Sequence, residues 1–360
     1  MAILKHDKES PFLLTGRSPR KRRHYSKCLL VILAIAALYF TTQLTSIGTF
    51  LTITPLVTTN RLQSNLANVV NKHAFCIFMD SDPIVYTEDQ SNDPYFISVR
   101  MLIYQLLHNK ATRSDPPIPV IVLVTAVTPD SKRYQLEADG AFIVEAESLS
   151  NDINLQWLKP SRDRWIRALD RLHAFKLVQF DKILLLDADM VLVKRIDGVF
   201  NSPESDVMQS LGIITPARIE ESGATPTPTR YLLAANSGPY GNHTYPAARG
   251  TRFSPSFLLL SPSIDMYAHY LSVAKVADSF SPGAPDTNLL NHIHRSDGNM
   301  PWKQLDPDWT VNSPTFSDYQ HGIRSLHEKW WRVEHDLDLR EIFLDIRWRM
   351  EGHWLAREST

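Results

Sequence analysis

The chain has 360 residues and a nearly balanced charge, with 38 lysines and arginines, 39 aspartates and glutamates, and a formal net charge of −1. The charge is unevenly distributed, because residues 1–27 carry a net +6 and the remainder therefore carries −7. A nucleic-acid-binding surface needs a basic face, so this balance argues against one in the main part of the chain. Residues 51–360 are enough for one large domain or two small ones with an ample core.

An uncharged stretch follows the basic N-terminus. Cys28–Phe40 is densely apolar, and no charged residue occurs before Arg61. Roughly 20 residues cross a bilayer, and Cys28–Phe50 supplies them. A cleaved signal peptide and a buried core helix are the alternatives, but the basic flank is long and no small-residue cleavage pattern directly follows the apolar core. We expect residues 1–27 to be a cytosolic tail and residues 28–50 a transmembrane signal anchor.

The anchor is expected to be followed by a stem, residues 51–72, and a globular domain, residues 73–355, on the lumenal side. Of the two cysteines, Cys28 lies in the predicted anchor, so Cys76 has no partner for an intrachain disulfide in the globular part. Asn242-His243-Thr244 is an acceptor sequence for N-glycosylation in a stretch rich in Pro and Gly. It would lie at the surface and be modified if the domain is lumenal.

Buried strands alternate with amphipathic helices in the first half of that domain. Four apolar runs are typical of strands: His73–Met79, Val120–Thr125, Ala141–Val144 and Ile183–Leu186. A run without polar alternation is typical of a strand that is buried on both faces of a parallel sheet. Helices are predicted between them, at Tyr95–His108, Ser131–Gly140 and Trp165–Phe180. The alternation predicts an α/β sandwich with a mostly parallel central sheet, whose ligands bind beyond the carboxyl ends of the strands.

The composition changes beyond Phe200. Residues 202–256 are rich in Pro, Gly, Ser and Thr, which predicts a long loop or a small subdomain. The later elements are expected to be strands at Phe257–Leu260 and Arg324–His327, and helices at Ile264–Val276, after Gly283 and at Glu341–Trp354, the last on the surface.

Two carboxylates follow the end of the strand Ile183–Leu186. Asp187 and Asp189 are two residues apart, so their side chains point the same way if the backbone stays extended. Left alone they would repel each other, which raises the pKa of at least one. A divalent ion such as Mn²⁺ or Mg²⁺ removes that conflict and keeps open positions for phosphates, so a nucleotide diphosphate is the expected ligand. The alternative is a pair of ordinary solvated loop carboxylates.

Several motifs, taken in order, resemble the glycogenin-like glycosyltransferases of family 8, in particular the membrane-anchored fungal members. The resemblance covers roughly residues 74–335 and implies a nucleotide-sugar transferase type A (GT-A) fold. The motifs are Asn92-Asp93-Pro94-Tyr95, Val122–Thr125, Gln179-Phe180-Asp181-Lys182 before the Asp-x-Asp, and Asp286 with Leu289-Leu290-Asn291.

The resemblance implies roles for residues in the metal and nucleotide sites. Asp187 and Asp189 would bind the metal and the nucleotide, and His327 would complete the metal site. Tyr95 would meet the uracil, although it could simply be a core aromatic of the first helical turn. Lys329 would serve the diphosphate, although it lies closer to His327 than the family spacing.

Further residues are assigned near the donor sugar. Arg171 falls where the family usually has a lysine near the sugar and phosphates, the alternative being a solvated helix residue. Asp286 would face the sugar, stabilising an oxocarbenium-like centre or acting as a nucleophile, the alternative being a helix N-cap. His321 could replace His327 as the metal ligand. His292 and His294 are expected to face solvent at a polar helix end.

The activity implied by the resemblance is Mn²⁺- or Mg²⁺-dependent, retaining transfer from a UDP-sugar to a hydroxyl of a glycan or glycoprotein. Anchor and sequon imply a type II protein of the Golgi, with the ER as an alternative. Two departures from the family pattern, Ser254-Pro255-Ser256 and Thr287, leave open an inactive membrane-tethered relative that binds nucleotide-sugar or glycan. A third possibility is an inverting or mannose-transferring enzyme with the same Asp-x-Asp device.

Overall fold

The computed structural model describes residues 72–80, 93–212, 225–238, 241 and 243–359. The chain divides after Arg61 into two units, and every described residue belongs to the second. The predicted basic tail, the anchor over residues 28–50, residues 51–71 of the stem and Asn242 of the sequon lie outside the described residues. Within the described ranges, no helix combines the length and the apolar character needed to cross a membrane.

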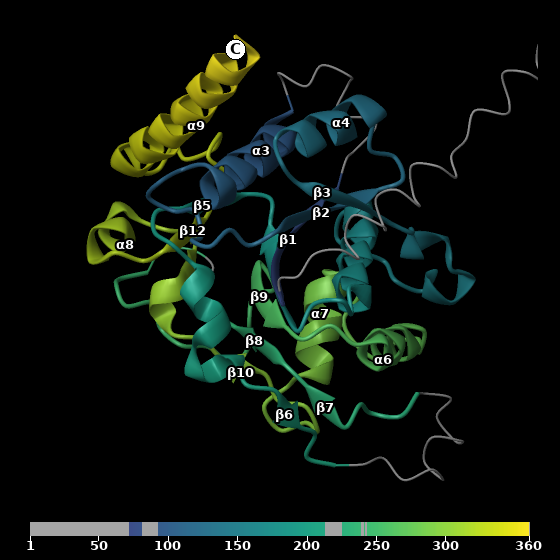
Figure 1. The fold of residues 1–360 in the computed structure, drawn as a ribbon. Coiled ribbons are helices and arrows are strands. Elements are labelled where there is room, and N and C mark those ends of the chain that lie inside the picture. The colour runs from purple at the N-terminus through teal and green to yellow at the C-terminus, as the bar shows by residue number, and fades with distance from the viewer. Residues whose placement is uncertain (1–71, 81–92, 213–224, 239–240, 242, 360) are drawn as a thin grey trace, which may run out of the picture. The chain divides into compact units, whose positions relative to one another are not determined.

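A seven-stranded sheet forms the centre of the second unit, in the order β10-β8-β9-β4-β1-β2-β3 (Figure 1). Its strands are β1 (His73–Met79), β2 (Val120–Thr125), β3 (Phe142–Ala146), β4 (Lys182–Asp187), β8 (Leu233–Ala235), β9 (Phe257–Leu260) and β10 (Lys303–Gln304). Strands β3, β2, β1 and β4 pair in parallel, as do β8 and β10. Only β9 runs antiparallel to its neighbours in this sheet. The predicted α/β fold with a mostly parallel central sheet is confirmed.

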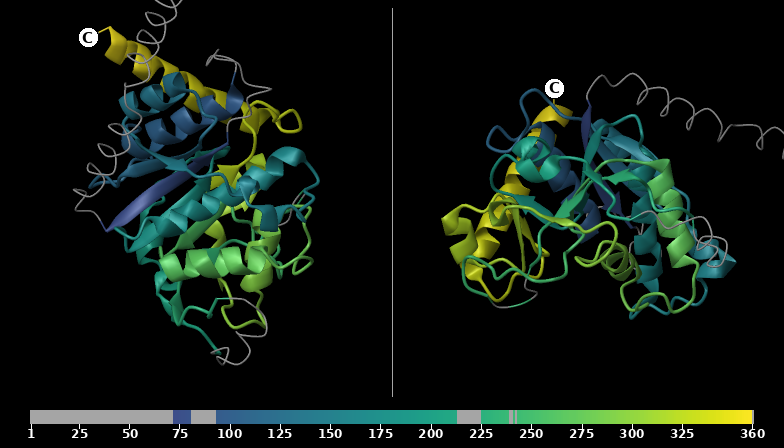
Figure 2. Two further views of the ribbon diagram at one scale, coloured as in Figure 1. Left: turned by 90° about the vertical axis from the view of Figure 1, so that its right-hand side faces the viewer. Right: turned by 90° about the horizontal axis from the view of Figure 1, so that it is seen from below.

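Both faces of the sheet are covered, which explains why its central strands are apolar throughout. Along β1, Ala74, Cys76 and Phe78 face one core cluster, and the alternate residues face the other. The first cluster is closed by a 3₁₀ helix, η4 (Asp163–Lys176), together with α6 (Ile264–Ala274) and α7 (Pro285–Ile293), as Figure 2 shows. The second is closed by α3 (Pro94–Leu107) and α4 (Asp130–Ala138).

A smaller sheet, β11-β12-β5, stands beside the main one. Its strands are β5 (Met190–Leu192), β11 (Thr310–Asn312) and β12 (Ser325–His327). The antiparallel pairing of β12 with β5 sets His327 opposite Met190, the residue after Asp189. Since β5 follows β4 directly, this pairing brings two distant parts of the sequence to the end of β4.

The last helix is longer and more buried than expected. Helix α9 runs from Leu337 to Glu358, and one row of its side chains packs against α3. That row consists of Leu339, Phe343, Ile346, Met350 and Trp354. The remaining described elements are β6 (Met208–Gln209), β7 (Arg230–Tyr231), α8 (Phe316–His321) and short 3₁₀ turns.

The region predicted as a loop or subdomain, residues 202–256, contains a strand of the central sheet. Leu233, Ala234 and Ala235 of β8 are fully buried between β9 and β10. A strand of three residues, two of them alanine, carries little of the β-branched and aromatic signal that marks strands in a sequence.

The helix predicted at Trp165–Phe180 is the 3₁₀ helix η4, and its side chains sort into three rows. A 3₁₀ helix has three residues per turn, so residues i and i+3 share a face. One row is apolar and enters the core: Ile166, Leu169, Leu172 and Phe175. A second is polar: Arg167, Asp170, His173 and Lys176. The third contains Trp165, Ala168 and Arg171, which line a cavity.

Asp170 in the polar row makes the stability depend on pH. The side chain is fully buried, Oδ1 accepts a hydrogen bond of 2.8 Å from the Leu149 amide, and Oδ2 has no hydrogen-bond partner among the described residues. Burial raises the pKa of Asp170 to about 7, and the nearby Asp80 adds to the shift. Because the folded protein holds this proton more tightly than the unfolded chain, stability is lost as the pH rises from about 4 to about 7.

We therefore expect Asp170→Asn to stabilise the protein at pH 8, where the carboxylate would be ionised, by on the order of 2–4 kcal/mol. At pH 4 the variant and the wild type should unfold at similar denaturant concentrations. Chemical denaturation at the two pH values measures this. The exposed Asp181, changed to Asn, is the matched control. Equal behaviour of Asp170→Asn and Asp181→Asn at pH 8 would contradict the prediction.

Candidate active site

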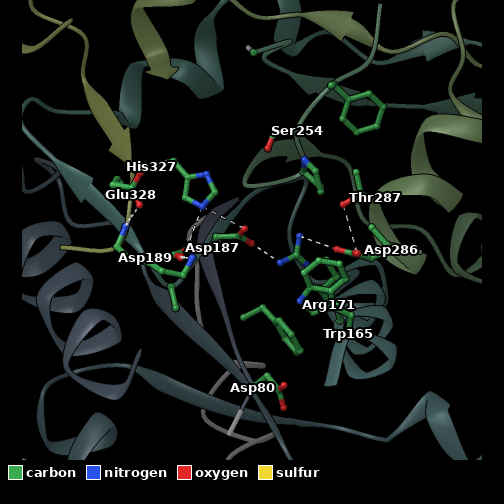
Figure 3. Close-up of a pocket in the computed structure, with 18 of the residues that line it drawn as sticks. Asp80, Trp165, Arg171, Asp187, Asp189, Ser254, Asp286, Thr287, His327 and Glu328 are labelled. Carbon is green, nitrogen blue, oxygen red and sulfur yellow. Dashed lines mark hydrogen bonds and ion pairs between the residues drawn. The ribbon is translucent and has the colours of Figure 1, made fainter. Parts of the chain in front are cut away.

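A cavity of about 1010 Å³ lies at the carboxyl ends of β1 and β4 (Figure 3). Asp80 follows β1, and Asp187 ends β4. The other walls come from η4, residues 250–255, the start of α7, and the segment after β12. This is where ligands of α/β sheets bind, at the ends of parallel strands.

Two carboxylates and an imidazole converge in this cavity. One ligand atom from each of Asp187, Asp189 and His327 lies within 4.8 Å of the others. His327 Nε2 is 3.1 Å from Asp189 Oδ1 and 3.7 Å from Asp187 Oδ2. The structure thus brings together the three residues predicted as metal ligands.

Asn312 fixes the orientation of His327. Asn312 Oδ1 is 2.7 Å from His327 Nδ1 and also accepts a hydrogen bond from the Ser256 hydroxyl at 3.1 Å. Since an amide oxygen only accepts, Nδ1 carries the hydrogen, and Nε2 faces the carboxylates with either a proton or a lone pair. A lone pair opposite a carboxylate oxygen is stable only with a cation between them. This donor set, two carboxylates and an oriented imidazole, fits Mn²⁺ or Mg²⁺.

Lys329 contacts the same cluster. Its Nζ is 3.0 Å from Asp189 Oδ2 and lies over the Tyr95 ring, 5.9 Å from the centroid. Burial would raise the pKa of Asp189, but His327 and Lys329 outweigh it and hold that pKa well below its usual range. Burial opposes the charge on His327 and Lys329 in turn, yet Asp189 raises the pKa of each. Asp189 therefore lies between His327 and Lys329, 3.1 and 3.0 Å from their nitrogen atoms.

Arg171 bridges the metal cluster and Asp286. The buried guanidinium donates from Nη2 to Asp187 Oδ1, and its Nη1 is 3.2 Å from Asp286 Oδ2. Burial alone would lower the pKa of Arg171, but the two carboxylates outweigh this effect, and the pKa is raised above its usual value. Asp286 is in the first turn of α7, whose N-cap is Ala284, so its carboxylate pairs with Arg171 and does not cap the helix. Figure 3 shows the metal cluster on one side of Arg171 and Asp286 with Thr287 on the other.

Tyr95 lines the cavity at the start of α3, which is capped by Asp93, and its ring lies edge-on to Trp331 at 4.9 Å. His321 is outside the cavity: it is exposed, stacks on Tyr245 and lies 2.7 Å from the Ser317 carbonyl oxygen.

The expectation that His294 faces solvent is wrong. The side chain is fully buried, 2.6 Å from the Tyr270 hydroxyl and 2.7 Å from the Met300 carbonyl oxygen. Burial lowers the pKa of His294 to about 3, so the ring is neutral. The residue just after α7 turns back into the core, which a local pattern of polar neighbours does not reveal.

Asn312 and Ser256 belong to the site but were missed in the sequence. Ser256 is part of the Ser254-Pro255-Ser256 departure; its carbonyl accepts a 2.9 Å hydrogen bond from the Asp187 amide. Asn291, quoted as a motif residue, binds both the amide and the carbonyl of Phe253 at 3.0 Å and so fixes the loop before β9. No spacing in the sequence marks Asn312, because its role depends on the pairing of β11 with β12.

Comparison with protein-family models finds no match. In sequence, the chain is similar to two fission yeast proteins, both described as uncharacterised. C5H10.12c of Schizosaccharomyces pombe is 26% identical over 265 residues, covering 67% of this chain and 70% of that protein. C4C3.09 is 26% identical over 265 residues, covering 68% and 69%. Human glycogenin-1 is 25% identical over 208 residues, covering 57% of this chain and 47% of glycogenin-1.

Similar solved structures include three glycosyltransferases. GlyE of Streptococcus pneumoniae TIGR4 has a TM-score of 0.44 and 15% identity; the match covers 80% of this chain and only 65% of the GlyE chain. The galactosyltransferase LgtC, in complex with donor and acceptor sugar analogs, has a TM-score of 0.42 and 13% identity, covering 76% and 95%. Mouse xyloside xylosyltransferase 1 has a TM-score of 0.43 and 12% identity, covering 71% and 97%.

Proposed function

We propose that the chain is a metal-dependent, retaining glycosyltransferase of the glycogenin-like family 8, which moves a sugar from a UDP-sugar to a hydroxyl group. The observation that carries this proposal is the cluster of Asp187, Asp189 and His327, with ligand atoms within 4.8 Å of one another, in a cavity of about 1010 Å³. Ligand cavities usually measure about 300–1,000 Å³, so this one has room for a nucleotide-sugar and an acceptor together. The sequence similarity to glycogenin-1 supports the same assignment.

Asp187, Asp189 and His327 would hold Mn²⁺ or Mg²⁺. When bound, the ion supplies charge compensation for the diphosphate that departs with UDP. The carboxylates suit both ions, and the imidazole favours Mn²⁺ of the two.

The chain's own cations would complete this charge compensation. Lys329 Nζ, now 3.0 Å from Asp189, would exchange that carboxylate for a phosphate oxygen. Arg171 lies between the metal cluster and Asp286, where it would stabilise charge on the leaving diphosphate. Tyr95 would lie beside the uracil. Asp286 would face the anomeric carbon, either stabilising positive charge there or acting as the nucleophile.

The proposal includes a place in the cell. The uncharged stretch over residues 28–50 after a basic tail supports a type II anchor, with residues 73–355 as a lumenal catalytic domain. The sequon at Asn242 supports exposure to the secretory pathway. The acceptor would then be a glycan or glycoprotein in the Golgi, with the ER as the alternative compartment.

The proposal is tested by titrating UDP into the purified full-length protein in detergent, with and without Mn²⁺. We expect binding in Mn²⁺ that is at least tenfold tighter than without it, and loss of this difference in the double variant Asp187→Asn/Asp189→Asn. Hydrolysis of UDP-sugars in the same preparation then identifies the donor.

Three results would count against the proposal. Absence of UDP binding under every metal condition would remove the nucleotide site itself. Mn²⁺-dependent UDP binding without hydrolysis or transfer from any UDP-sugar would favour an inactive nucleotide-sugar-binding relative. Inversion of the anomeric configuration in a product would contradict the retaining assignment.

A further inference from the structure

The cavity continues along η4, away from the metal cluster. Trp165 and Ala168 precede Arg171 in the row that lines the cavity. Arg162, which lies three residues before Trp165, lines the cavity as well. With a rise of about 2.0 Å per residue, Trp165 lies about 12 Å along the helix from Arg171. In an α-helix, two side chains six positions apart, such as those of Trp165 and Arg171, would point about a third of a turn away from each other. The 3₁₀ geometry therefore carries the cavity wall past Asp286 to a second end.

The charges at the two ends differ. The four aspartates that line the cavity all have cationic partners: Asp187 and Asp286 pair with Arg171, Asp189 with Lys329, and Asp80 with Arg167, whose guanidinium forks onto it at 2.8 and 3.2 Å. Each of these four carboxylates therefore contacts a cation of the protein, and Arg171 is shared by two of them.

Three guanidinium groups in the cavity wall have no carboxylate partner among the described residues: Arg162, Arg252 and Arg332. Arg332 follows Lys329 at the nucleotide end, where its amide binds the Lys329 carbonyl at 2.7 Å. Arg162 lies beside Trp165, and Arg252 contacts Asn288 of α7. Two cations in one cavity that have no carboxylate partner in the described part of the chain favour an anionic ligand there.

Arg252 is held in place by α7. Its Nη2 donates to Asn288 Oδ1 at 2.6 Å, and the next residue, Phe253, is clamped by Asn291. Asn288 is the residue after Thr287, so the guanidinium is tied to the turn that carries Asp286. The arginine is exposed but has a defined position.

Arg162 stands over an aromatic platform. Its guanidinium carbon is 5.3 Å from the centroid of the half-buried Trp165 ring. The neighbouring Ser161 amide binds the Gly283 carbonyl at 2.9 Å, which ties this segment to the turn before α7. The Trp165 indole can pack against a sugar ring, and a guanidinium beside it can bind a carboxylate or phosphate on that sugar through two hydrogen bonds.

We propose that this second end of the cavity is an acceptor subsite for a sugar bearing a carboxylate or a phosphate. This inference rests on the proposed function, since it assigns the nucleotide-sugar to the end with the metal cluster. Trp165 packs against the acceptor ring, and Arg162 and Arg252 bind its anionic group. Arg can bind carboxylate and phosphate oxygens through two parallel hydrogen bonds.

The test compares charged and neutral acceptor analogues on the full-length protein saturated with UDP and Mn²⁺. Calorimetric titrations use methyl glucuronide against methyl glucoside, and glucose 6-phosphate against glucose. In at least one pair, we expect the anionic analogue to bind at least about tenfold more tightly than its neutral partner. A tenfold difference in affinity corresponds to about 1.4 kcal/mol. The pair that shows the difference identifies carboxylate or phosphate.

Variants then assign the preference to its residues. Arg252→Gln and Arg162→Gln should each reduce the anionic preference to near unity. Arg295→Gln, which removes an exposed arginine paired with Asp297 outside the cavity, is the matched control and should keep it. Loss of the preference in Arg295→Gln as well would mean a nonspecific charge effect and would overturn the assignment.

The readouts separate failure of this inference from failure of the proposed function. If UDP does not bind the wild type, the proposed function itself fails. If UDP binds but neither anionic analogue binds better than its neutral partner, only the acceptor assignment is overturned. A third result concerns the donor. If UDP-glucuronate binds more tightly than UDP-glucose, and Arg252→Gln removes this difference, the arginines bind the donor sugar and the acceptor assignment is overturned.

Discussion

Replacing Asp189 by asparagine is expected to lower the proposed transfer from a UDP-sugar by about 10³-fold, an effect typical of removing an electrostatic stabiliser of the leaving group. Asp189 is 7% exposed and faces both His327 Nε2 and Lys329 Nζ at 3.1 and 3.0 Å. An amide keeps the volume and one oxygen but removes the charge that would balance the divalent ion. Binding of UDP should weaken in Mn²⁺ and change little without it.

The control for this substitution is Asp181→Asn. Asp181 lies just before β4, with its side chain 62% exposed, and its ion-pair partner among the described residues is the exposed Lys72 at 3.5 Å. Exposed pairs of this kind contribute little to stability, so turnover and melting temperature should match the wild type. Turnover of Asp189→Asn within tenfold of Asp181→Asn, in folded protein, would remove Asp189 from the proposed metal site.

Replacing Arg171 by methionine is expected to destabilise the protein by about 3–5 kcal/mol, the usual cost of removing one partner from a buried ion pair. Arg171 is 7% exposed and is the cation in contact with both Asp187 and Asp286. Its loss leaves the buried Asp286 carboxylate without a counter-ion among the described residues. Transfer activity should be lost as well, since the proposed reaction needs this cation beside the diphosphate.

A double variant separates the ion pair from general damage to η4. In Arg171→Met/Asp286→Asn the second substitution removes the uncompensated charge, so part of the stability lost in Arg171→Met should return. Arg349→Met, on the outer face of α9 and paired with Asp345, is the exposed control and should unfold like the wild type. If the double variant is less stable than Arg171→Met, the two side chains do not act as a pair in the native state. Denaturant titrations at pH 7.5 measure all four proteins.

Much of the fold could be predicted because its strands are marked locally. The structure has strands at His73–Met79, Val120–Thr125 and Phe257–Leu260, as the apolar runs indicated. Burial on both faces makes a central strand apolar throughout, so the run itself carries the information. The Asp93 cap and the proline after it similarly mark the start of α3.

The strand β8 and the 3₁₀ type of the helix η4 were not predicted, because local patterns do not determine them. The strand Leu233–Ala235 is too short to show a pattern and is defined by its neighbours in the sheet. The spacing of Ile166, Leu169, Leu172 and Phe175 is three throughout, which is the period of a 3₁₀ helix, but this spacing also occurs within an α-helical stripe.

The sequence alone determined which groups could bind a metal and a diphosphate: the Asp187–Asp189 pair at the end of a buried strand, with Arg171, Asp286, His327 and Lys329 named through the family resemblance. Only the tertiary structure decided their partners. His327 reaches Asp189 across 138 positions of sequence through the pairing of β12 with β5, and Lys329 reaches it across 140. Asn312 acquires its position from β11, and the row of Trp165, Ala168 and Arg171 acquires its position from the 3₁₀ helix. Local patterns encode burial and caps, whereas these contacts depend on how distant strands pair.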